Sequence, residues 1–407
     1  MTRVEAERLI PGRGEVVDDG VVVIDSGAIS YAGPAAGAPE SEGAEVIAAD
    51  TVMPGLWECH GHFIGTYTFN ISEIHTLRPQ LGAMRVTADA RRALMAGFTS
   101  VREMGGMGTF LGRAIEEGQV IGPNVYASGG MLSMTGGHGD EHGMDLAFSR
   151  ISTARQWGED NICDGPDECR AGVRRMLRLG AKVIKIHASG GVMSELDDPM
   201  LPQFSKAELE AIVDEATRME RLVGAHCHGE RGIMAALEAG VKTIEHGTYL
   251  DEETADAMVE TGAILVPTRW ILEYLLAEGT KHGMPEYARI KGEATATRHS
   301  DSIALAIDKG VKIALGTDIW STGLWGRNAE ELALLVEAGM TPLAAIEAAT
   351  ANGPDTLGPQ APKSGQLLDG YDADLICVRG DPTTDVSVLA DPDNITHVWK
   401  GGTLFKG

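Results

Sequence analysis

The stretch "LWECHGHF" (56–63) ends an apolar run with two histidines, His60 and His62, one residue apart. In an extended strand, residues i and i+2 point to the same face, so both imidazoles can reach one object. A lone histidine at the end of a strand is more often a structural residue than a ligand. The pair therefore points to a metal only if other ligand side chains occupy comparable positions elsewhere in the chain.

Comparable apolar runs recur through the middle of the chain, most of them followed by a helical-looking segment such as "SKAELEAIVDEATRME" (205–220), which opens with a capping box. The runs are 51–60, 98–105, 123–130, 181–191, 222–229, 242–247, 262–267 and 311–318. Eight strands interleaved with helices predict an α/β fold of the (β/α)8 TIM-barrel type. A doubly wound open sheet is the alternative, but no GxGxxG motif follows the first strand.

Both ends of the chain are rich in short strand-like runs separated by Ser-Gly, Asp-Gly and Gly-Gly turns. These runs are "VVVIDSGAISYAG" (21–33), "GQLLDGYDADLICV" (365–378) and "ITHVWKGGTLFKG" (395–407). Strand-rich ends around a different middle predict that both termini build one small β-domain. We assign residues 1–53 and 356–407 to this domain and residues 54–355 to the barrel.

The formal net charge of −25 argues against nucleic-acid binding or attachment to an anionic membrane. No stretch approaches 18 uninterrupted apolar residues, and no signal-peptide pattern opens the chain. Five scattered cysteines without a CxxC pair suggest neither a disulfide framework nor a cysteine-ligated zinc site. We expect a cytoplasmic protein.

Side chains able to bind a metal stand at the carboxyl ends of the predicted strands: His60, His62, Lys185, His226, His246 and Asp318. In a barrel all these ends open on one face, where active sites are built. Each residue alone is weak evidence, since Asp318 could cap a helix and a histidine could be structural. A lysine, however, is costly to bury unpaired. The set as a whole indicates a metal centre.

The sequence resembles the amidohydrolase superfamily in "PGLWECHGH" (54–62), "VIKIHASGG" (183–191), "GAHCHG" (224–229), "TIEHG" (243–247) and "LGTD" (315–318). The resemblance covers essentially the whole chain, and the strand-rich ends resemble the split β-sandwich of that superfamily. The segments "SGG…DDP…QFS" (189–205) and "GYDADLICV" (370–378) are most similar to the imidazolonepropionase-related branch. That branch includes Xaa-Pro dipeptidases, carboxypeptidases acting on Lys or Arg ends, and ochratoxin-hydrolysing amidases.

The resemblance implies two divalent metal ions. His60, His62 and Asp318 would hold the buried ion, and His226 and His246 the more exposed one. Lys185, carboxylated by carbon dioxide or bicarbonate, would bridge them. Nitrogen and oxygen donors suit zinc best, with manganese and cobalt left open. The bridging lysine disfavours imidazolonepropionase itself and the deaminases, which resemble members with one metal.

The resemblance also implies a reaction, in which a metal-bridging hydroxide attacks an amide and Asp318 transfers its proton to the departing nitrogen. We expect a dipeptide or N-acyl amino acid as substrate, in the manner of an Xaa-Pro dipeptidase or a carboxypeptidase. The alternatives are a cyclic amide, a carbamate, a urea or another xenobiotic or mycotoxin amide. A ligand-depleted binding protein and a serine hydrolase are disfavoured, because all six ligand positions are filled and no G-x-S-x-G motif occurs.

Relatives carry substrate-contacting residues at two further histidines. His228, the second histidine of "AHCHG", is expected to contact substrate rather than metal. His138, in the glycine-rich "TGGHGDEHG" (135–143), is expected to polarise the scissile carbonyl or to hold the substrate carboxylate. Tyr67, Arg269 and Trp320 follow strand ends and could line the pocket, although packing is the simpler interpretation of each. We expect a small-molecule substrate and a homo-oligomer.

Overall fold

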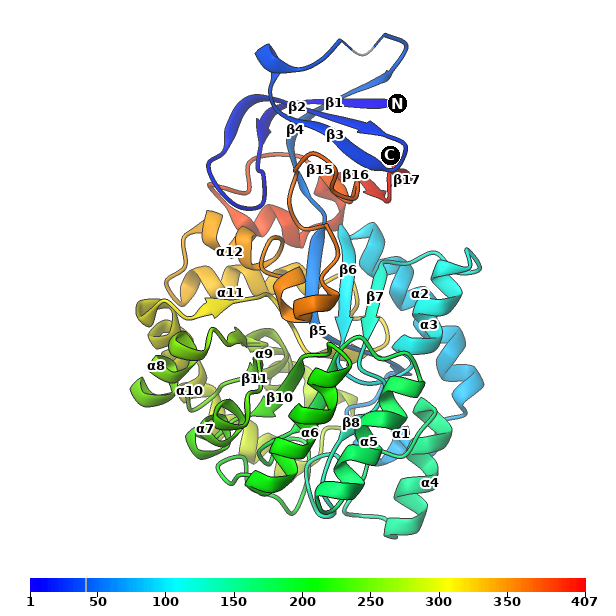
Figure 1. Cartoon of the computed structure of the whole chain (residues 1–407), viewed down its shortest axis with the longest axis vertical. Coiled ribbons are helices and arrows are strands. Elements are labelled where there is room, and N and C mark those ends of the chain that lie inside the picture. The colour runs from blue at the N-terminus through cyan, green and yellow to red at the C-terminus, as the bar shows by residue number, and fades with distance from the viewer. Residues whose placement is uncertain (41) are drawn as a thin grey trace.

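The computed structural model describes residues 1–40 and 42–407 and divides into two parts (Figure 1). A large body of parallel strands and surrounding helices forms most of the molecule. A sheet built from both ends of the chain lies against one end of this body (Figure 1).

The strands of the body pair in parallel throughout two sheets. The first sheet has the order β14 (Ile319–Ser321), β5 (Leu56–Thr66), β6 (Phe98–Glu103), β7 (Asn124–Ala127). The second has the order β13 (Lys312–Ile313), β12 (Ile264–Val266), β11 (Thr243–His246), β10 (Val223–Cys227), β9 (Ile184–His187), β8 (Met131–Leu132). Each of the eight predicted runs contains all or part of one of these strands, while β8 and β14 are short additions that the sequence did not suggest.

Backbone hydrogen bonds connect the two sheets at both of their junctions. On one side, Cys59 N donates to Leu315 O over 2.9 Å and Asp318 N donates to His60 O over 2.6 Å. On the other side, Lys182 N donates to Ala127 O over 2.8 Å. The segments around β5 and around Asp318 are therefore held side by side.

The helices follow the strands, as the alternating pattern predicted. They are α1 (Ile71–Ile74), α2 (Pro79–Met95), α3 (Gly108–Glu116), α4 (Leu146–Trp157), α5 (Pro166–Arg178), α6 (Lys206–Arg218), α7 (Glu230–Ala239), α8 (Glu252–Thr261), α9 (Arg269–Glu278), α10 (Glu286–Lys309), α11 (Glu331–Glu337) and α12 (Pro342–Ala348). The capping box of Ser205 and Glu208 opens α6 as predicted. Within the described ranges, no helix combines the length and the apolar character needed to cross a membrane.

The strands of the chain ends form one seven-stranded sheet. Its order is β17 (Thr403–Lys406), β16 (Ile395–Lys400), β15 (Leu375–Val378), β4 (Glu45–Pro54), β1 (Thr2–Leu9), β2 (Val17–Asp25), β3 (Ala28–Pro34). The two ends of the chain join where β4 and β15 pair antiparallel, with Pro54 opposite Leu375. The strand pairing of the chain ends thus forms one sheet, and the two-sheet sandwich that we expected is not confirmed. The boundaries 1–53 and 356–407 stay a prediction.

Gly55 lies where the chain passes from the terminal sheet into β5, and its amide donates to Asp374 O over 2.9 Å. A Cβ atom added at Gly55 would lie 2.1 Å from Thr99 Oγ1, well inside van der Waals contact. We expect Gly55→Ala to lower the free energy of unfolding by about 1–3 kcal/mol, as overpacking does in well-filled cores, measured by urea denaturation.

Gly143→Ala is the matched control, because the nearest atom to its added Cβ is Glu141 Oε1 at 3.4 Å. Equal unfolding midpoints for the two variants would show that the close approach at Gly55 is unimportant.

Candidate metal centre

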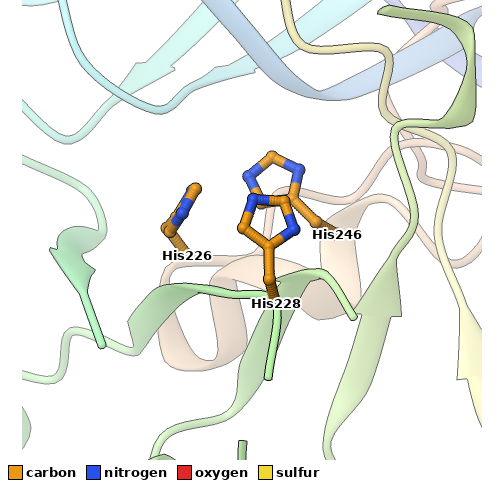
Figure 2. A group of neighbouring side chains, drawn as sticks. All are labelled: His226, His228 and His246. Atoms are coloured by element: carbon orange, nitrogen blue, oxygen red, sulfur yellow. The ribbon is translucent and has the colours of Figure 1, made fainter. Parts of the chain in front are cut away.

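The predicted ligands lie together in the structure, in two groups that could each hold a metal ion. The first group is His60, His62 and Asp318, and the second is His226, His228 and His246 (Figure 2). Within each group the candidate ligand atoms lie within 4.8 Å of one another. Lys185 lines the same cavity as both groups. Residues that are distant in sequence thus converge as the barrel geometry predicted.

In the first group, the Asp318 carboxylate stands against two imidazoles. Its Oδ1 atom lies 3.0 Å from His62 Nε2 and 3.6 Å from His60 Nε2. The Nζ atom of Lys185 lies 3.1 Å from the same His60 Nε2. Burial alone would raise the pKa of Asp318, but the positive potential from His60, His62 and Lys185 lowers it below its usual value. Asp318 is therefore an ionised oxygen donor, as a metal site requires.

Hydrogen bonds through one ring nitrogen orient most of these histidines. The Nδ1 contacts are His60 to Glu245 Oε2 at 2.8 Å, His62 to Gly105 O at 2.8 Å, His228 to Thr248 Oγ1 at 2.7 Å and His246 to Thr268 Oγ1 at 2.6 Å. His226 is held the other way round, with Nε2 3.2 Å from Gly190 O. Such partners fix ring orientation and tautomer, so Nε2 is the ligand atom left in four rings and Nδ1 the one left in His226.

The second group brings three imidazole rings together (Figure 2). His226 lies on β10, His228 lies just beyond that strand, and His246 ends β11. Burial lowers the pKa of His228 to about 3 and places the pKa values of His226 and His246 well below the usual value. All three rings are therefore neutral, which is the state that binds metal. Because the group includes His228 alongside the two predicted ligands, the role of His228 as a substrate contact stays a prediction.

A buried ion pair that the sequence analysis missed supports the first group. Arg102 Nη2 donates to both carboxylate oxygens of Glu245 at 2.8 Å, and Arg102 Nε donates to Cys59 O at 2.6 Å. Both side chains are fully buried. Burial would raise the pKa of Glu245, but Arg102, His60 and Lys185 hold it well below the usual range. The signal was present in the sequence, since Arg102 and Glu245 interrupt the apolar runs "FTSVREMG" and "TIEHG".

Two adjoining cavities open at the metal centre. The one of about 110 Å³ is lined by the candidate ligands and by Ile271, Leu272 and Leu275. The other, of about 140 Å³, shares six lining residues with the first: His62, Met131, His138, His187, Met193 and Asp318. Its remaining wall carries six apolar or aromatic side chains, Ile64, Ile71, Ile74, Trp157, Tyr287 and Trp320, together with polar ones that include the carboxylates Asp140, Glu141 and Glu195. A ligand at the metal centre can therefore extend an apolar group into this recess.

The predicted substrate contacts divide between the cavities and the outside of the fold. His138 lines both cavities, His228 the first and Trp320 the second. Tyr67 is 55% exposed and lies under the Arg85 guanidinium, 4.9 Å from its ring centre. Arg269 turns outward to Ala296 O and Glu273. Among the described residues that line the two cavities, neither Tyr67 nor Arg269 appears, and their contact with a substrate stays a prediction.

The fold and these ligand groups define a metal-dependent hydrolase of the α/β, TIM-barrel type, and the comparisons give its family. The amidohydrolase family profile matches residues 51–405, so the chain belongs to the amidohydrolase family. This membership confirms the prediction of an enzyme that hydrolyses carbon–nitrogen bonds of the amide type.

The ochratoxinase of Aspergillus niger is 44% identical over 422 residues, covering all of this chain and 87% of the relative. Its crystal structure superimposes with a TM-score of 0.92, covering all of this chain and 95% of the other. A prolidase complexed with N-methylphosphonate-L-proline is 32% identical with a TM-score of 0.92, over all of this chain and 99% of the other.

More distantly, the imidazolonepropionase of Nocardia farcinica is 24% identical over 415 residues, covering 95% of this chain and 92% of the relative. Together these relatives confirm the predicted imidazolonepropionase-related branch.

We expect Glu245→Gln to leave Arg102 buried without its counter-charge and His60 without its carboxylate partner. Breaking a buried pair in this way costs about 3–5 kcal/mol of unfolding free energy, and loss of a ligand's supporting hydrogen bond lowers metal affinity about 10- to 100-fold. Urea denaturation and competition with a metal-binding dye measure the two effects.

Glu117→Gln is the control, since Glu117 pairs with Arg113 and the two side chains are 51% and 74% exposed. An exposed pair contributes about 0–1 kcal/mol, so this variant should keep both stability and metal affinity. Similar losses in the two variants would contradict the special role of Glu245.

Proposed function

We propose that this protein is a binuclear metal-dependent amidohydrolase that cleaves the amide bond of a dipeptide or an N-acyl amino acid. The observation that carries the proposal is the convergence of Lys185 and the two buried ligand groups on one cavity. His60, His62 and Asp318 would hold one ion, and His226 and His246 the other. Zinc suits these nitrogen and oxygen donors.

The surroundings of Lys185 support its carboxylation. Its side chain is buried, and burial lowers its pKa to about 8, which makes the reactive neutral amine accessible. Its nearest polar contact is the ring nitrogen of His60, and among the described residues no carboxylate lies within ion-pair distance of Nζ. Reaction with carbon dioxide or bicarbonate would replace a cation that repels metal by an anionic oxygen ligand able to bridge two ions.

Bound divalent ions would lower the pKa of water toward neutrality and polarise the substrate carbonyl. The side chains of the protein transfer the proton and orient the substrate. Asp318 accepts a proton from the attacking water and delivers it to the departing nitrogen. His228 and His138 orient the substrate from the cavity wall, and Trp320 lines the second cavity.

The apolar side chains of the second cavity favour a substrate with an apolar or aromatic group beside the scissile amide. A dipeptide or an N-acyl amino acid meets this requirement, and the prolidase relative binds a proline derivative. The 44% identity to an ochratoxinase favours a second candidate, an amide of the mycotoxin type. Cyclic amides, carbamates and ureas remain further alternatives.

We also infer that the eight predicted strands close into one barrel, which would bring the two ligand groups to a single face. The hydrogen bonds from Cys59 to Leu315 and from Lys182 to Ala127, one at each junction of the two sheets, support this closure.

The metal content of two variants tests whether His226 binds metal and His228 contacts the substrate. We expect His226→Ala to lose about one metal per chain and His228→Ala to keep both, because the amidohydrolase pattern places the metal ligand at the first histidine of "AHCHG". Mass spectrometry of the native protein counts the ions. Loss of metal only in His228→Ala would reverse the assignment.

A product screen tests the proposed reaction. Protein reconstituted with zinc and bicarbonate is offered pooled Xaa-Pro, Xaa-Arg/Lys and Xaa-aromatic dipeptides together with N-acyl amino acids, and the released amino acids are identified by mass spectrometry. We expect release of proline or an aromatic residue, slowed by about 10²- to 10⁴-fold in Asp318→Asn because the proton carrier is lost. No release from any pool by protein holding two metals would reject the proposal.

A further inference from the structure

His138 reaches the centre of the site from the glycine-rich loop before α4. Its ring stacks on His226 with 4.3 Å between ring centres and an interplanar angle of 21°. On another side the ring rests against Gly191, where an added Cβ would lie 2.1 Å from His138 Cε1. The ring is therefore held in one place between two neighbours, at the wall that both cavities share.

A short chain of hydrogen bonds leads from this ring to a buried carboxylate. His138 Nδ1 lies 2.6 Å from Ser194 Oγ, and Ser194 Oγ forms a short hydrogen bond with Asp197 Oδ1. The Asp197 side chain is only 5% exposed. It also accepts from Gly191 N at 3.1 Å and Gln203 Nε2 at 3.2 Å, and lies 3.2 Å from Lys291 Nζ on α10.

These contacts keep Asp197 ionised. Burial alone would raise the pKa of Asp197, but the contacts with His138, Ser194 and Lys291 hold it well below the usual range. An ionised carboxylate has only lone pairs to offer. The hydroxyl proton of Ser194 must therefore lie between Ser194 and Asp197, because two facing lone pairs would repel each other at that separation.

Counting protons then places a proton on one nitrogen of the ring. Ser194 has one hydroxyl proton, and once it is donated to Asp197 the oxygen can only accept from His138. At 2.6 Å from Ser194 Oγ, the Nδ1 atom of His138 must carry the proton that it donates. Nε2 is the other ring nitrogen. Across residues 1–40 and 42–407, the structure gives His138 Nε2 no hydrogen-bond partner of its own.

We infer that Ser194 and Asp197 are positioning residues that keep a proton on His138 Nδ1, so that Nε2 is the ring nitrogen left for a substrate. This inference rests on the proposed function in treating His138 as a substrate contact. It also sharpens that role, because one identified ring nitrogen is left to make the contact.

The proton on Nδ1 can be read directly, without turnover, from the ¹⁵N resonances of zinc-loaded protein labelled at histidine. The signals of His138 are those that disappear in His138→Gln. In the unsubstituted protein we expect Nδ1 at a protonated-type shift. In Asp197→Asn the Nδ1 shift should move toward the lone-pair type, because the carboxylate that orients the Ser194 hydroxyl is lost. Ser194→Ala provides a second, smaller change should the first variant fail to fold.

Tyr287→Phe is the matched control, since it removes a hydroxyl that donates to Met193 O over 3.3 Å in the same loop but leaves Ser194, Asp197 and their hydrogen bonds to the ring. The His138 shifts should stay as in the unsubstituted protein. A lone-pair-type shift at Nδ1 in the unsubstituted protein would overturn the inference. So would unchanged shifts in both Asp197→Asn and Ser194→Ala, or equal changes in Tyr287→Phe. None of these outcomes depends on amide cleavage, so failure here is distinct from failure of the proposed function.

Discussion

The charge pair of Arg102 and Glu245 is the interaction on which the site depends. Both side chains are fully buried in the middle of the parallel sheets, so each must neutralise the other within the fold. Arg102 extends from β6 to Glu245 on β11 and to the backbone of Cys59 on β5, and Glu245 in turn binds His60. Three strands and one candidate ligand are thereby fixed by a single pair, and none can shift without separating buried charges.

A second buried acidic side chain, Glu58 of β5, connects this strand to the segment before β14. Glu58 accepts hydrogen bonds from His60 N at 2.8 Å, Thr317 Oγ1 at 2.7 Å and Asn328 Nδ2 at 2.7 Å. It thus holds the segment that carries Asp318, which adopts a left-handed φ of 59°. Such a conformation costs free energy for most residues and persists where its surroundings determine it. The position of the Asp318 carboxylate follows from this support behind it.

The convergence of the candidate ligands could be predicted from sequence because parallel strands bring their carboxyl ends to one edge, whatever the detailed register. His60, Lys185 and Asp318 needed only that rule. Their supporting partners were not predictable in the same way. The pairing of Ser194 and Asp197 with His138 depends on how two long loops meet, and no periodicity encodes this.

The side-chain directions of Arg269 and Tyr67 could not be predicted from the sequence either. Both follow strands, but the direction of a side chain beyond a strand end depends on neighbours that the sequence does not specify. The Arg269 guanidinium donates hydrogen bonds to Ala296 O and to the carboxylate of Glu273. Charged residues inside apolar runs could have indicated these buried contacts. Arg102, Glu245 and Glu58 each stand in such a run, and a buried charge needs a partner.

The joining of β4 to β15 bears on how the protein is made. During synthesis β1 to β4 emerge first, and they can pair among themselves, but the edge of β4 that receives Leu375 stays open until the body of the molecule has been translated. An open strand edge is a template for wrong pairing with other chains. The nascent chain thus carries an unsatisfied edge through most of its synthesis. Protection of that edge by a chaperone, or slow pairing on the ribosome, then becomes part of the expression behaviour of this fold.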